Sequence, residues 1–379
     1  MLALYGLLAI VWALSLGLTA LGTLYSWWRM NVAPSPRMWQ PGLPGVSILK
    51  PIKGVDPGLF DNLISFADID YPTYEVILSV ADEKDPAVKV CQRILDLFPG
   101  GVFRLIIGDT PLGCNPKVNN LDASEKSAKH DVILVSDSNV RAHRSYLQET
   151  TPLLRNELNG IITAPIQGFG GIGWGGQLEE LHLNTFYARW MNFAKFFDQS
   201  FVMGKSMMYR RSVAEKFGGI ASCAQFINED YIMGLLMKFV GKRIDLMKRP
   251  IRQYVGGRTF KEFWSRHQRW SVIQKKSVVW VYALHPLQFS YVMAIMGAIA
   301  VPHVWDLNGL QVAAITVVGW YGLDIAMVKA IGGKIPDPRL WILREAILPF
   351  IWIDSLLTNY VDWRGHKLKI NRDGIISKG

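Results

Sequence analysis

The first part of the chain carries no charged residue from Leu2 to Trp28, and Leu, Ala, Gly, Val and Ile dominate this run. A helix that crosses the hydrocarbon core of a bilayer needs about 20 apolar residues, so the run is long enough to do so. A cleaved signal peptide is the alternative. No basic segment precedes the run, however, and it exceeds the roughly 7–15 apolar residues of a signal peptide. We therefore predict an uncleaved transmembrane anchor over residues 1–29.

The residues at the end of this run predict its orientation. Trp27 and Trp28 are followed by the basic residues Arg29 and Arg37. Tryptophan is enriched at the membrane–water interface, and Lys and Arg are enriched on the cytosolic side. We therefore expect an integral membrane protein with its N-terminus outside and the following domain in the cytosol. The compact chain suits a bacterial inner membrane.

The last third of the chain contains three further apolar segments. Val278–Trp305 and Leu310–Leu323 are separated by the short Asp306–Gly309 turn, a spacing that predicts a helical hairpin. The third segment, Leu340–Trp363, is interrupted by charges at Arg344, Glu345, Asp354 and Asp362. Charged side chains are costly in the bilayer core, which favours a helix that lies in the interface or is covered by protein.

The final residues, 364–379, form a basic segment that is expected to lie in the cytosol. A start and an end on the same side of the membrane require an even number of crossings between them. A hairpin plus an interfacial helix in the region 278–363 meets this requirement. The basic residues of this predicted tail are Arg364, His366, Lys367, Lys369 and Arg372.

Between residues 38 and 277 the sequence has the pattern of a water-exposed α/β domain, because short apolar runs alternate with amphipathic stretches. Such alternation predicts a mostly parallel sheet with right-handed crossovers. The ligand site of such a sheet lies beyond the carboxyl ends of the strands. Strands are expected at 46–49, 75–81, 103–107 and 131–136, with helices after Asp56-Pro57, after Asp85-Pro86 and over 117–129.

Three carboxylates in this domain are candidates for chemistry. Asp82 and Asp137 each follow a predicted strand, and a divalent cation bound with phosphates needs at least one such oxygen ligand. A single acid at a strand end is more often a turn-former, but two at one edge favour a site. Asp230 precedes the predicted helix 232–240, where it is either a partner of the helix dipole or a general base.

Six motifs occur together in one order along the chain. The set resembles the ceramide glucosyltransferases, a membrane branch of the GT-A glycosyltransferases, and it spans residues 46–270. The motifs are Val46–Pro57, Asp70-Tyr71-Pro72, Asn115–Leu121, Asp137-Ser138, Glu229-Asp230-Tyr231 and Arg266-x-x-Arg269-Trp270.

The resemblance implies a Rossmann-like α/β GT-A domain with transmembrane helices at both ends. It also implies inverting transfer of a hexose, with glucose favoured, from a UDP-sugar to the primary hydroxyl of ceramide, which makes glucosylceramide. Mn²⁺ or Mg²⁺ would serve as cofactor. By the same resemblance, Asp230 would be the general base, Asp137 would bind the metal, and Asp82, Lys117, Arg266, Arg269 and Trp270 would bind the donor.

The sequence departs from the family pattern at two places. Tyr187 stands where many members carry a histidine, in a segment expected to touch the acceptor or the donor. We place Tyr187 and Glu229 on the acceptor side. Asp137 is followed by Ser138-Asn139 rather than by a second acid, so the metal would depend on one protein carboxylate.

Other functions remain open at this stage. The same chemistry could act on a hopanoid or diacylglycerol, whereas a polysaccharide synthase would need more C-terminal segments to form a channel. Gly168–Gly173 satisfies G-x-G-x-x-G, but it follows several strand–helix units and lacks the downstream acid of a dinucleotide site. We interpret it as a flexible loop near the acceptor. A non-catalytic membrane scaffold would leave the acids at strand ends unexplained.

Charge and cysteine content narrow the possible functional classes of this protein further. The net charge of +10 comes largely from clusters near the apolar segments, and no nucleic-acid-binding module accompanies it. This pattern indicates a membrane surface and a phosphate-bearing substrate rather than nucleic acid. The three cysteines, far apart in sequence, match no zinc spacing or disulfide framework, so we expect reduced thiols.

Overall fold

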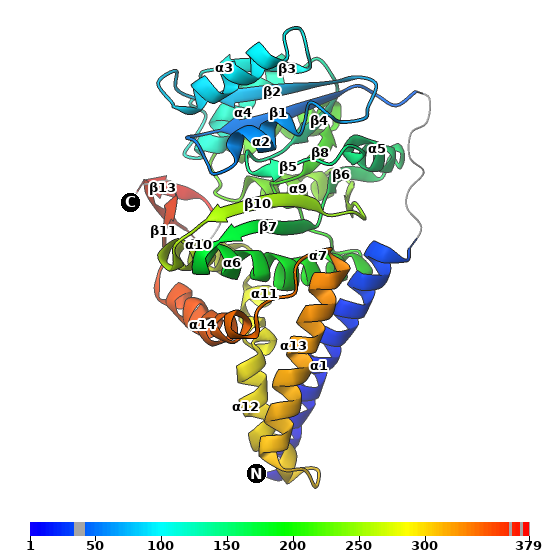
Figure 1. The fold of residues 1–379 in the computed structure, drawn as a ribbon, viewed down its shortest axis with the longest axis vertical. Helices are drawn as coiled ribbons and strands as arrows, with labels where there is room; N and C mark the ends of the chain where they lie inside the picture. Colours follow the sequence, from blue (N-terminus) through cyan, green and yellow to red (C-terminus); the bar gives the residue numbers. More distant parts are fainter. Residues whose placement is uncertain (34–41, 364–365, 372–373, 379) are drawn as a thin grey trace.

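The computed structural model describes residues 1–33, 42–363, 366–371 and 374–378. An α/β domain occupies one end of the molecule and a bundle of apolar helices the other (Figure 1). The N-terminus lies at the far tip of the bundle, and the C-terminus lies beside the α/β domain. The expectations for Arg37, for the boundary at residue 38, and for Arg364 and Arg372 fall outside the described residues.

The main sheet has seven strands in the order β3-β2-β1-β4-β8-β6-β9. Strands β3, β2, β1 and β4 run parallel, as predicted, while β8 is antiparallel to both of its neighbours. The strands are β1 Val46–Ile52, β2 Tyr74–Val80, β3 Phe103–Ile107, β4 Val132–Val135, β6 Asn159–Thr163, β8 Met207–Arg210 and β9 Arg243–Leu246.

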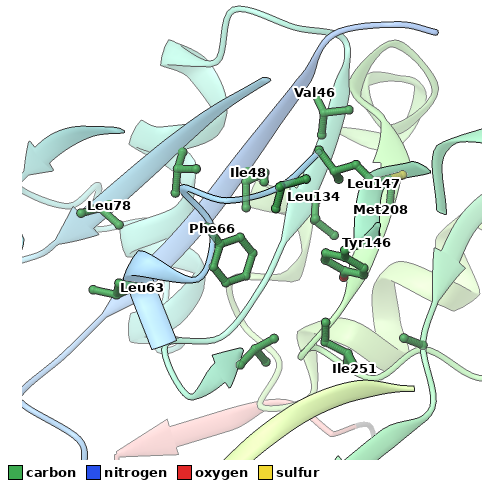
Figure 2. Close-up of a cluster of buried hydrophobic side chains, with 14 of the residues drawn as sticks. Val46, Ile48, Leu63, Phe66, Leu78, Leu134, Tyr146, Leu147, Met208 and Ile251 are labelled. Carbon is green, nitrogen blue, oxygen red and sulfur yellow. The ribbon is translucent and has the colours of Figure 1, made fainter. Parts of the chain in front are cut away.

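Alternate residues of these strands enter two separate apolar cores, because successive side chains of a strand point to opposite faces. Val46 and Ile48 of β1 face the core that contains Phe66 and Tyr146 (Figure 2). Leu49 of the same strand faces the other core. Both faces of the sheet are therefore covered, which explains the near-continuous apolar strands of the sequence.

Helices α2 Leu59–Ile64, α3 Ala87–Leu97, α4 Pro116–Ser127 and α9 Glu229–Phe239 belong to this domain. The predicted helices are present, with ends shifted by a few residues. Helix α2 begins later than the predicted Asp56-Pro57 start, because Gly58 caps it in a left-handed conformation with φ 71°. Asn115 caps α4, where its side chain accepts the N–H groups of Lys117 and Val118.

A second, three-stranded sheet joins β5 Val140–Arg141, β10 Ile251–Gly257 and β7 Ile166–Ile172. Strand β7 contains most of the Gly168–Gly173 segment, so the prediction of a flexible loop there was wrong. Helix α6, Gly173–His182, follows it directly. A Cβ atom on Gly171 would lie 2.5 Å from the carbonyl oxygen of Gly176, so glycine here permits close packing of strand against helix rather than a loop.

After α6 the chain continues as a π-helical turn, Leu183–Tyr187, and then as α7, Ala188–Phe196. After β10 it continues as α10, Phe260–Ser277, whose start is closed by a capping box between Thr259 and Glu262. Helices α6, α7 and α10 lie at the end of the α/β domain that faces the apolar bundle (Figure 1).

Two helices of the bundle, α1 Leu2–Asn31 and α13 Gly309–Ala330, are long and apolar enough to cross a membrane by length and composition. The predicted fold class, an α/β domain with apolar helices at both ends, is confirmed. The basic residue Arg29 is buried rather than free at an interface. Its guanidinium donates hydrogen bonds to Asn192 Oδ1 and to the carbonyl groups of Leu246 and Met247.

The segment Val278–Trp305, predicted as the first part of a helical hairpin, is not a single helix. The segment contains the short helix α11, Val279–Ala283, then a 3₁₀ turn at His285–Gln288, and then α12, Ser290–Ala300. Pro286 explains the break, because proline cannot donate a helical hydrogen bond and clashes with the preceding turn. At 11 residues, α12 is only about 17 Å long, and a 3₁₀ turn at Val301–His303 extends it.

The third apolar segment also differs from its prediction. Helix α14 spans Pro338–Leu357 and lies across the base of the α/β domain (Figure 1), whereas residues 360–363 leave the helix and form strand β11. Strand β11, Tyr360–Trp363, pairs with β12, His366–Ile370, which pairs with β13, Ile376–Lys378. Leu368, Ile370 and Ile376 pack against Ile227 and Val272. The described part of residues 364–379 is therefore a folded sheet on the α/β domain rather than a separate tail.

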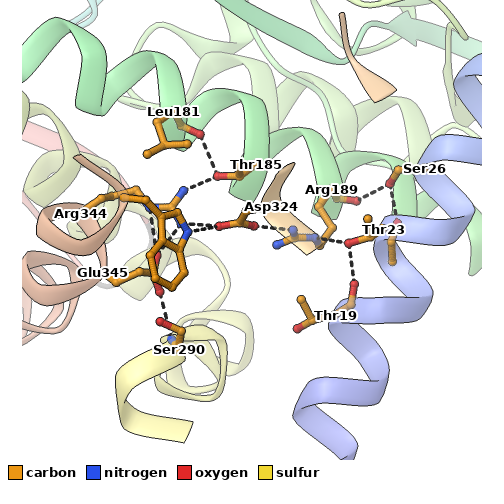
Figure 3. A network of polar contacts seen from close by, with 12 residues as sticks. Thr19, Thr23, Ser26, Leu181, Thr185, Arg189, Ser290, Asp324, Arg344 and Glu345 are labelled. Carbon is orange, nitrogen blue, oxygen red and sulfur yellow. Dashed lines mark hydrogen bonds and ion pairs between the residues drawn. The ribbon is translucent and has the colours of Figure 1, made fainter. Parts of the chain in front are cut away.

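A buried ionic network joins the apolar helices to the α/β domain (Figure 3). Asp324 of α13 forms ion pairs with Arg189 of α7 and Arg344 of α14. The indole N–H of Trp341 donates to the same carboxylate at 2.8 Å, and Glu345 forms a further ion pair with Arg344. Asp324 has no exposed surface. Asp324, Arg344 and Glu345 thus face protein, as expected for costly intramembrane charges.

We expect Asp324→Asn to lower the free energy of unfolding by about 3–5 kcal/mol, because it leaves two buried guanidinium groups without their shared counter-charge. Thermal unfolding of the purified protein in detergent measures the change. Asp306→Asn, the same substitution at an exposed turn residue, is the control and should leave the unfolding temperature unchanged. Equal unfolding temperatures for the two variants would contradict the assigned importance of the network.

Candidate active site

The carboxyl ends of β1, β2 and β4 meet at one edge of the main sheet. Asp137 follows β4 closely, and Asp82 follows β2, with β1 between them. The strand spacing places the two residues two strands, or about 10 Å, apart on this edge. Asp82 is exposed, and its carboxylate accepts the N–H of Lys84 at 2.9 Å. The predicted common edge is therefore present, although Asp82 has no contact with Asp137.

Asp137 lies between two lysines. Its Oδ1 is 2.8 Å from Lys117 Nζ and its Oδ2 is 3.1 Å from Lys205 Nζ. Burial alone would raise the pKa of Asp137, but the two lysines outweigh this effect and lower the pKa well below its ordinary value. The carboxylate is therefore ionised at every physiological pH.

Lys117 joins Asp137 to a second acid. Its Nζ lies 2.7 Å from Glu229 Oε1, and the two carboxylates raise the pKa of Lys117 although burial would lower it. The cap of α4 by Asn115 brings Lys117 into the first turn of that helix. Glu229, predicted on the acceptor side, is thus held by an ion pair at the centre of the site.

Asp230 faces the same point from the start of α9. Its Oδ2 accepts the N–H of Gly204 at 2.7 Å, and its Oδ1 accepts the N–H of Tyr231 at 2.8 Å. Burial and the neighbouring charge of Glu229 raise the pKa of Asp230 to about 6. Among the acids of the site, Asp230 therefore combines an ionised state at neutral pH with the ability to take up a proton.

These side chains converge on Gly204. A Cβ atom on this residue would lie 2.9 Å from Lys117 Nζ, 3.2 Å from Glu229 Oε1 and 3.3 Å from Asp230 Oδ2. Three segments far apart in the chain, the start of α4, the turn before β8 and the start of α9, therefore meet in one small volume. Of the predicted residues, Asp137, Lys117, Glu229 and Asp230 are brought together here.

A second group of predicted residues lies on α10 and the π-helical turn. Tyr187 is buried and contacts the indole of Trp270, with 5.1 Å between ring centroids. Arg266 lies over the ring of Trp270 at 4.6 Å and pairs with Glu179 at 3.0 Å. π-Helical turns occur often at functional sites.

Arg269 is directed elsewhere. Its guanidinium donates a 2.8 Å hydrogen bond to the carbonyl oxygen of Asp362 in β11. Burial lowers the pKa of Lys205, and the charge of Arg266 lowers it further. The charge of Arg266 therefore acts on Lys205, which pairs with Asp137, and this connects the second group electrostatically to Asp137. Arg269, in contrast, contacts the C-terminal sheet.

Two lysines of the site were not singled out from the sequence. Lys50 is fully buried in β1, and its ammonium donates to Ser136 Oγ and to the carbonyl oxygen of Asp137. Burial lowers the pKa of Lys50 well below its ordinary value. A lysine inside an apolar strand was a usable signal for it. Lys205 follows Gly204 in a segment without any distinguishing pattern.

The residues of the site can be compared with the ligands that a divalent cation requires. Within the described part of the chain, no three His, Cys, Asp or Glu side chains form a group that could hold a metal alone. Asp137 provides one hard oxygen ligand, and Lys117 and Lys205, which pair with it, supply positive charge. The set fits a cation that arrives with a diphosphate, which would complete its oxygen shell.

Comparison with known proteins identifies the family. The sequence model for glycosyl transferase family 21 matches residues 7–376. The chain belongs to this family. It is therefore a glycosyltransferase, and the predicted resemblance to the ceramide glucosyltransferases is confirmed. The mixed sheet with its flanking helices accords with the GT-A fold that this resemblance implied.

The individual relatives have low sequence identity to this chain but match most of its length. Ceramide glucosyltransferase 3 of Caenorhabditis elegans is 27% identical over 86% of this chain and 72% of its own length. Ceramide glucosyltransferase of Komagataella phaffii is 25% identical over 98% of this chain and 91% of its own length. A solved structure, mannosyltransferase PcManGT from Pyrobaculum calidifontis in complex with GDP-Man and Mn²⁺, is 14% identical. It covers 92% of this chain and 98% of that chain with a TM-score of 0.48.

For this family 21 glycosyltransferase, we expect Gly204→Ala to reduce the rate of sugar transfer by roughly 10²-fold, because displacement of reacting groups by about 1 Å costs that much. The added methyl group meets only the ends of the side chains of Lys117, Glu229 and Asp230 and no backbone atom, so the unfolding temperature should change little. Transfer assays and thermal unfolding of the same preparation measure both effects. Gly257→Ala, where no atom lies within 4 Å of the added carbon, is the control. Full activity of Gly204→Ala would contradict the convergence of these groups in the working enzyme.

Proposed function

We propose that this family 21 glycosyltransferase transfers a hexose, with glucose favoured, from a UDP-sugar to the primary hydroxyl of ceramide. The observation that carries the proposal is the arrangement around Gly204. There, a carboxylate with a raised pKa, Asp230, lies beside the ion-paired chain Asp137–Lys117–Glu229. Names of relatives at 22–27% identity support ceramide as the acceptor and glucose as the sugar.

The cations of the site suit the leaving group of a UDP-sugar. Charge develops on the diphosphate as the bond to the sugar breaks, and preorganised positive groups stabilise that charge. Lys117 and Lys205 pair with Asp137 and can turn towards phosphate oxygens, and the charge of Arg266 acts on Lys205. Bound Mn²⁺ or Mg²⁺ would neutralise further charge as a Lewis acid. Asp137 is the residue that would hold it, and Asp82 stays a predicted contact to the nucleotide.

Asp230 is the proposed general base. A lipid hydroxyl is a poor nucleophile until its proton is removed, and a base works best when its pKa lies close to the working pH. The amide groups of Gly204 and Tyr231 hold the carboxylate of Asp230 in one orientation. Proton removal on the side opposite to the diphosphate gives a single displacement with inversion at the sugar carbon.

A lipid acceptor requires access to a membrane, and two helices of this chain are long and apolar enough to cross one. We propose that α1 and α13 span the membrane and that the α/β domain lies on the cytosolic side. The basic residues Arg29, Lys329 and Lys334 all lie towards the domain end of these helices, whereas the short connection 304–308 at the other end has none. This asymmetry follows the positive-inside rule. Residence in a bacterial inner membrane stays a prediction.

Sugar transfer by the purified protein in detergent tests the function. The assay offers a panel of UDP-sugars to ceramide with Mn²⁺ or Mg²⁺, and mass spectrometry identifies the product. Metal-dependent formation of glucosylceramide, abolished by EDTA, is the expected result. Transfer to a hopanoid or diacylglycerol but not to ceramide would contradict ceramide as the acceptor. Transfer that EDTA does not affect would contradict the proposed requirement for a metal ion.

Asp230→Asn should lower the rate of transfer by about 10²–10⁴-fold, the usual effect of removing a positioned general base. The amide keeps the size of the side chain, so the affinity for UDP measured by calorimetry should be retained. Asp131→Asn is the matched control, because Asp131 carries a partly exposed carboxylate and precedes β4, at the end of the strand opposite to Asp137. A loss of UDP affinity equal to the loss of rate would contradict the assignment of Asp230 as the base.

The pH profile is the second readout for the same residue. The base must be ionised, so the rate of the native enzyme should fall as the pH drops through about 6 and stay level above it. Glu229 raises this pKa by charge repulsion, so Glu229→Gln should move the acidic limb to lower pH. A limb that stays in place in Glu229→Gln would show that another group controls it.

A further inference from the structure

A buried carboxylate on α6 lies between two arginines. Glu179 has no exposed surface. Its Oε2 is 2.9 Å from Nε of Arg258, which follows β10, and its Oε1 is 3.0 Å from Nε of Arg266 in α10. The two arginine side chains are 22% and 17% exposed. One acid thus joins two cations that come from different elements and keep some access to solvent.

The charges of this cluster do not balance. Within the described residues, Glu179 is the only acid at ion-pair distance from either arginine. Asp56 and Glu262 act on the first arginine only over a longer range. In the network at Asp324, by contrast, two arginines meet two acids, because Glu345 supplies the second negative charge. A surplus positive charge in a mostly buried place is costly, so an anion bound there would be stabilising.

Close packing of glycines fixes α6 against the chain around Arg258. A Cβ atom on Gly176 would lie 2.5 Å from the carbonyl oxygen of Gly256, and one on Gly175 would overlap the carbonyl group of Thr259. The first turn of α6 therefore touches the backbone on both sides of the arginine, with no room for a side chain. The carboxylate, one turn further along α6, is held in place by this contact.

Arg258 lies near the acid that is proposed to bind the metal. The N–H of Tyr254 in β10 donates to the carbonyl oxygen of Asn139 at 2.9 Å. Because β10 and β5 are antiparallel, the chain beyond this bond continues towards Ser138 and the residue before it. The hydroxyl of Ser138 donates to Asp56 at 3.1 Å, and the charge of Asp56 acts on Arg258.

Arg266 reaches the same edge of the sheet from α10. Its charge acts on Lys205, whose Nζ lies 3.1 Å from Asp137 Oδ2. Its guanidinium also lies over the ring of Trp270 at 4.6 Å, so the ring and Glu179 hold it together. Since one carboxylate contacts Nε of both arginines, one anion on the side away from that carboxylate can contact both as well.

We propose that Arg258 and Arg266 bind the sugar-linked phosphate of the nucleotide donor, and that Glu179 positions the two guanidinium groups for it. The inference rests on the proposed function and adds Arg258 as a donor-binding residue and Glu179 as a positioning residue. Contact with the carboxylate through Nε leaves the Nη groups for phosphate oxygens, which guanidinium groups bind with two parallel hydrogen bonds. Charge develops on this phosphate as the bond to the sugar breaks, and the two cations would stabilise it.

The test compares UDP with UMP, which lacks the phosphate in question. Calorimetry uses the full-length protein in detergent with Mn²⁺. Arg258→Gln should raise the Kd for UDP roughly tenfold, the contribution of one charged hydrogen bond, and should change the Kd for UMP less than about twofold. Glu179 and Arg266 remain a balanced pair in this variant, so its unfolding temperature should change little. Arg258→Lys keeps the charge without the planar fork and should recover part of the affinity for UDP.

A double-mutant cycle tests the positioning role of Glu179. Glu179→Gln keeps the size of the side chain but releases both arginines, so it should lower the ratio of UDP affinity to UMP affinity. If the residue acts through Arg258, the same change should lower this ratio less in the Arg258→Gln background than in the native protein. Equal effects in the two backgrounds would overturn the positioning role.

Arg104→Gln is the matched control, because Arg104 pairs with the buried Glu75 at 2.8 Å near the start of β2, at the edge of the sheet opposite to Asp82. It should leave both affinities unchanged. An unchanged Kd for UDP in Arg258→Gln, or equal weakening of UDP and UMP, would overturn the phosphate site. If this variant does not fold, Arg258→Lys gives the same readout with a smaller loss.

An anionic lipid headgroup is the other source of a phosphate. Loss of activation by short-chain phosphatidylglycerol in Arg258→Gln, with UDP affinity unchanged, would show that a lipid occupies the site and would overturn its assignment to the donor. Failure of the unaltered protein to bind either nucleotide would instead refute the proposed function.

Discussion

The carboxylate of Asp324 connects the apolar helices of the molecule to its α/β domain. It lies on an apolar helix, yet it pairs with guanidinium groups from α7 and α14 and is wholly buried. A buried charge is tolerated only while its partners stay in place, because removal of one partner leaves an uncompensated ion. The network therefore fixes the apolar helices relative to the α/β domain. Arg344 also donates to Thr185 within the π-helical turn, which is the turn that carries Tyr187.

The site at the sheet edge uses the same physical principle with more exposure to solvent. Asp137, Lys117 and Glu229 alternate in charge, so each ion has an opposite neighbour within 3 Å. Lys205 adds a further positive charge beside Asp137. Such a set can exchange partners when a negatively charged diphosphate enters, since the lysines can move from carboxylate to phosphate oxygens. Among the residues that the structure describes, Asp230 has no ion-pair partner of this kind, and backbone amides hold its carboxylate, which can accept a proton.

The two ends of the site match the two kinds of substrate that we propose. Lysines and carboxylates gather at the carboxyl edge of the sheet, where a polar nucleotide sugar can bind from water. Aromatic rings and neutral imidazoles gather where α10 meets α14 and the apolar helices. Helix α10 contributes to both ends, because Arg266 affects Lys205 whereas His267 and Trp270 face Tyr187.

Local patterns in the sequence determined the α/β class, the positions of β1 to β4 along the chain, the apolar ends of the chain and the acids at the strand ends. They did so because hydrophobic period and end-capping residues act over a few neighbours. The tertiary structure alone decided the pairing of Lys117 with Glu229, the role of Gly204, the burial of Arg29 and the sheet formed after α14. These features depend on contacts between residues tens to hundreds of positions apart, and no local pattern records which distant side chain or carbonyl group will satisfy a buried charge.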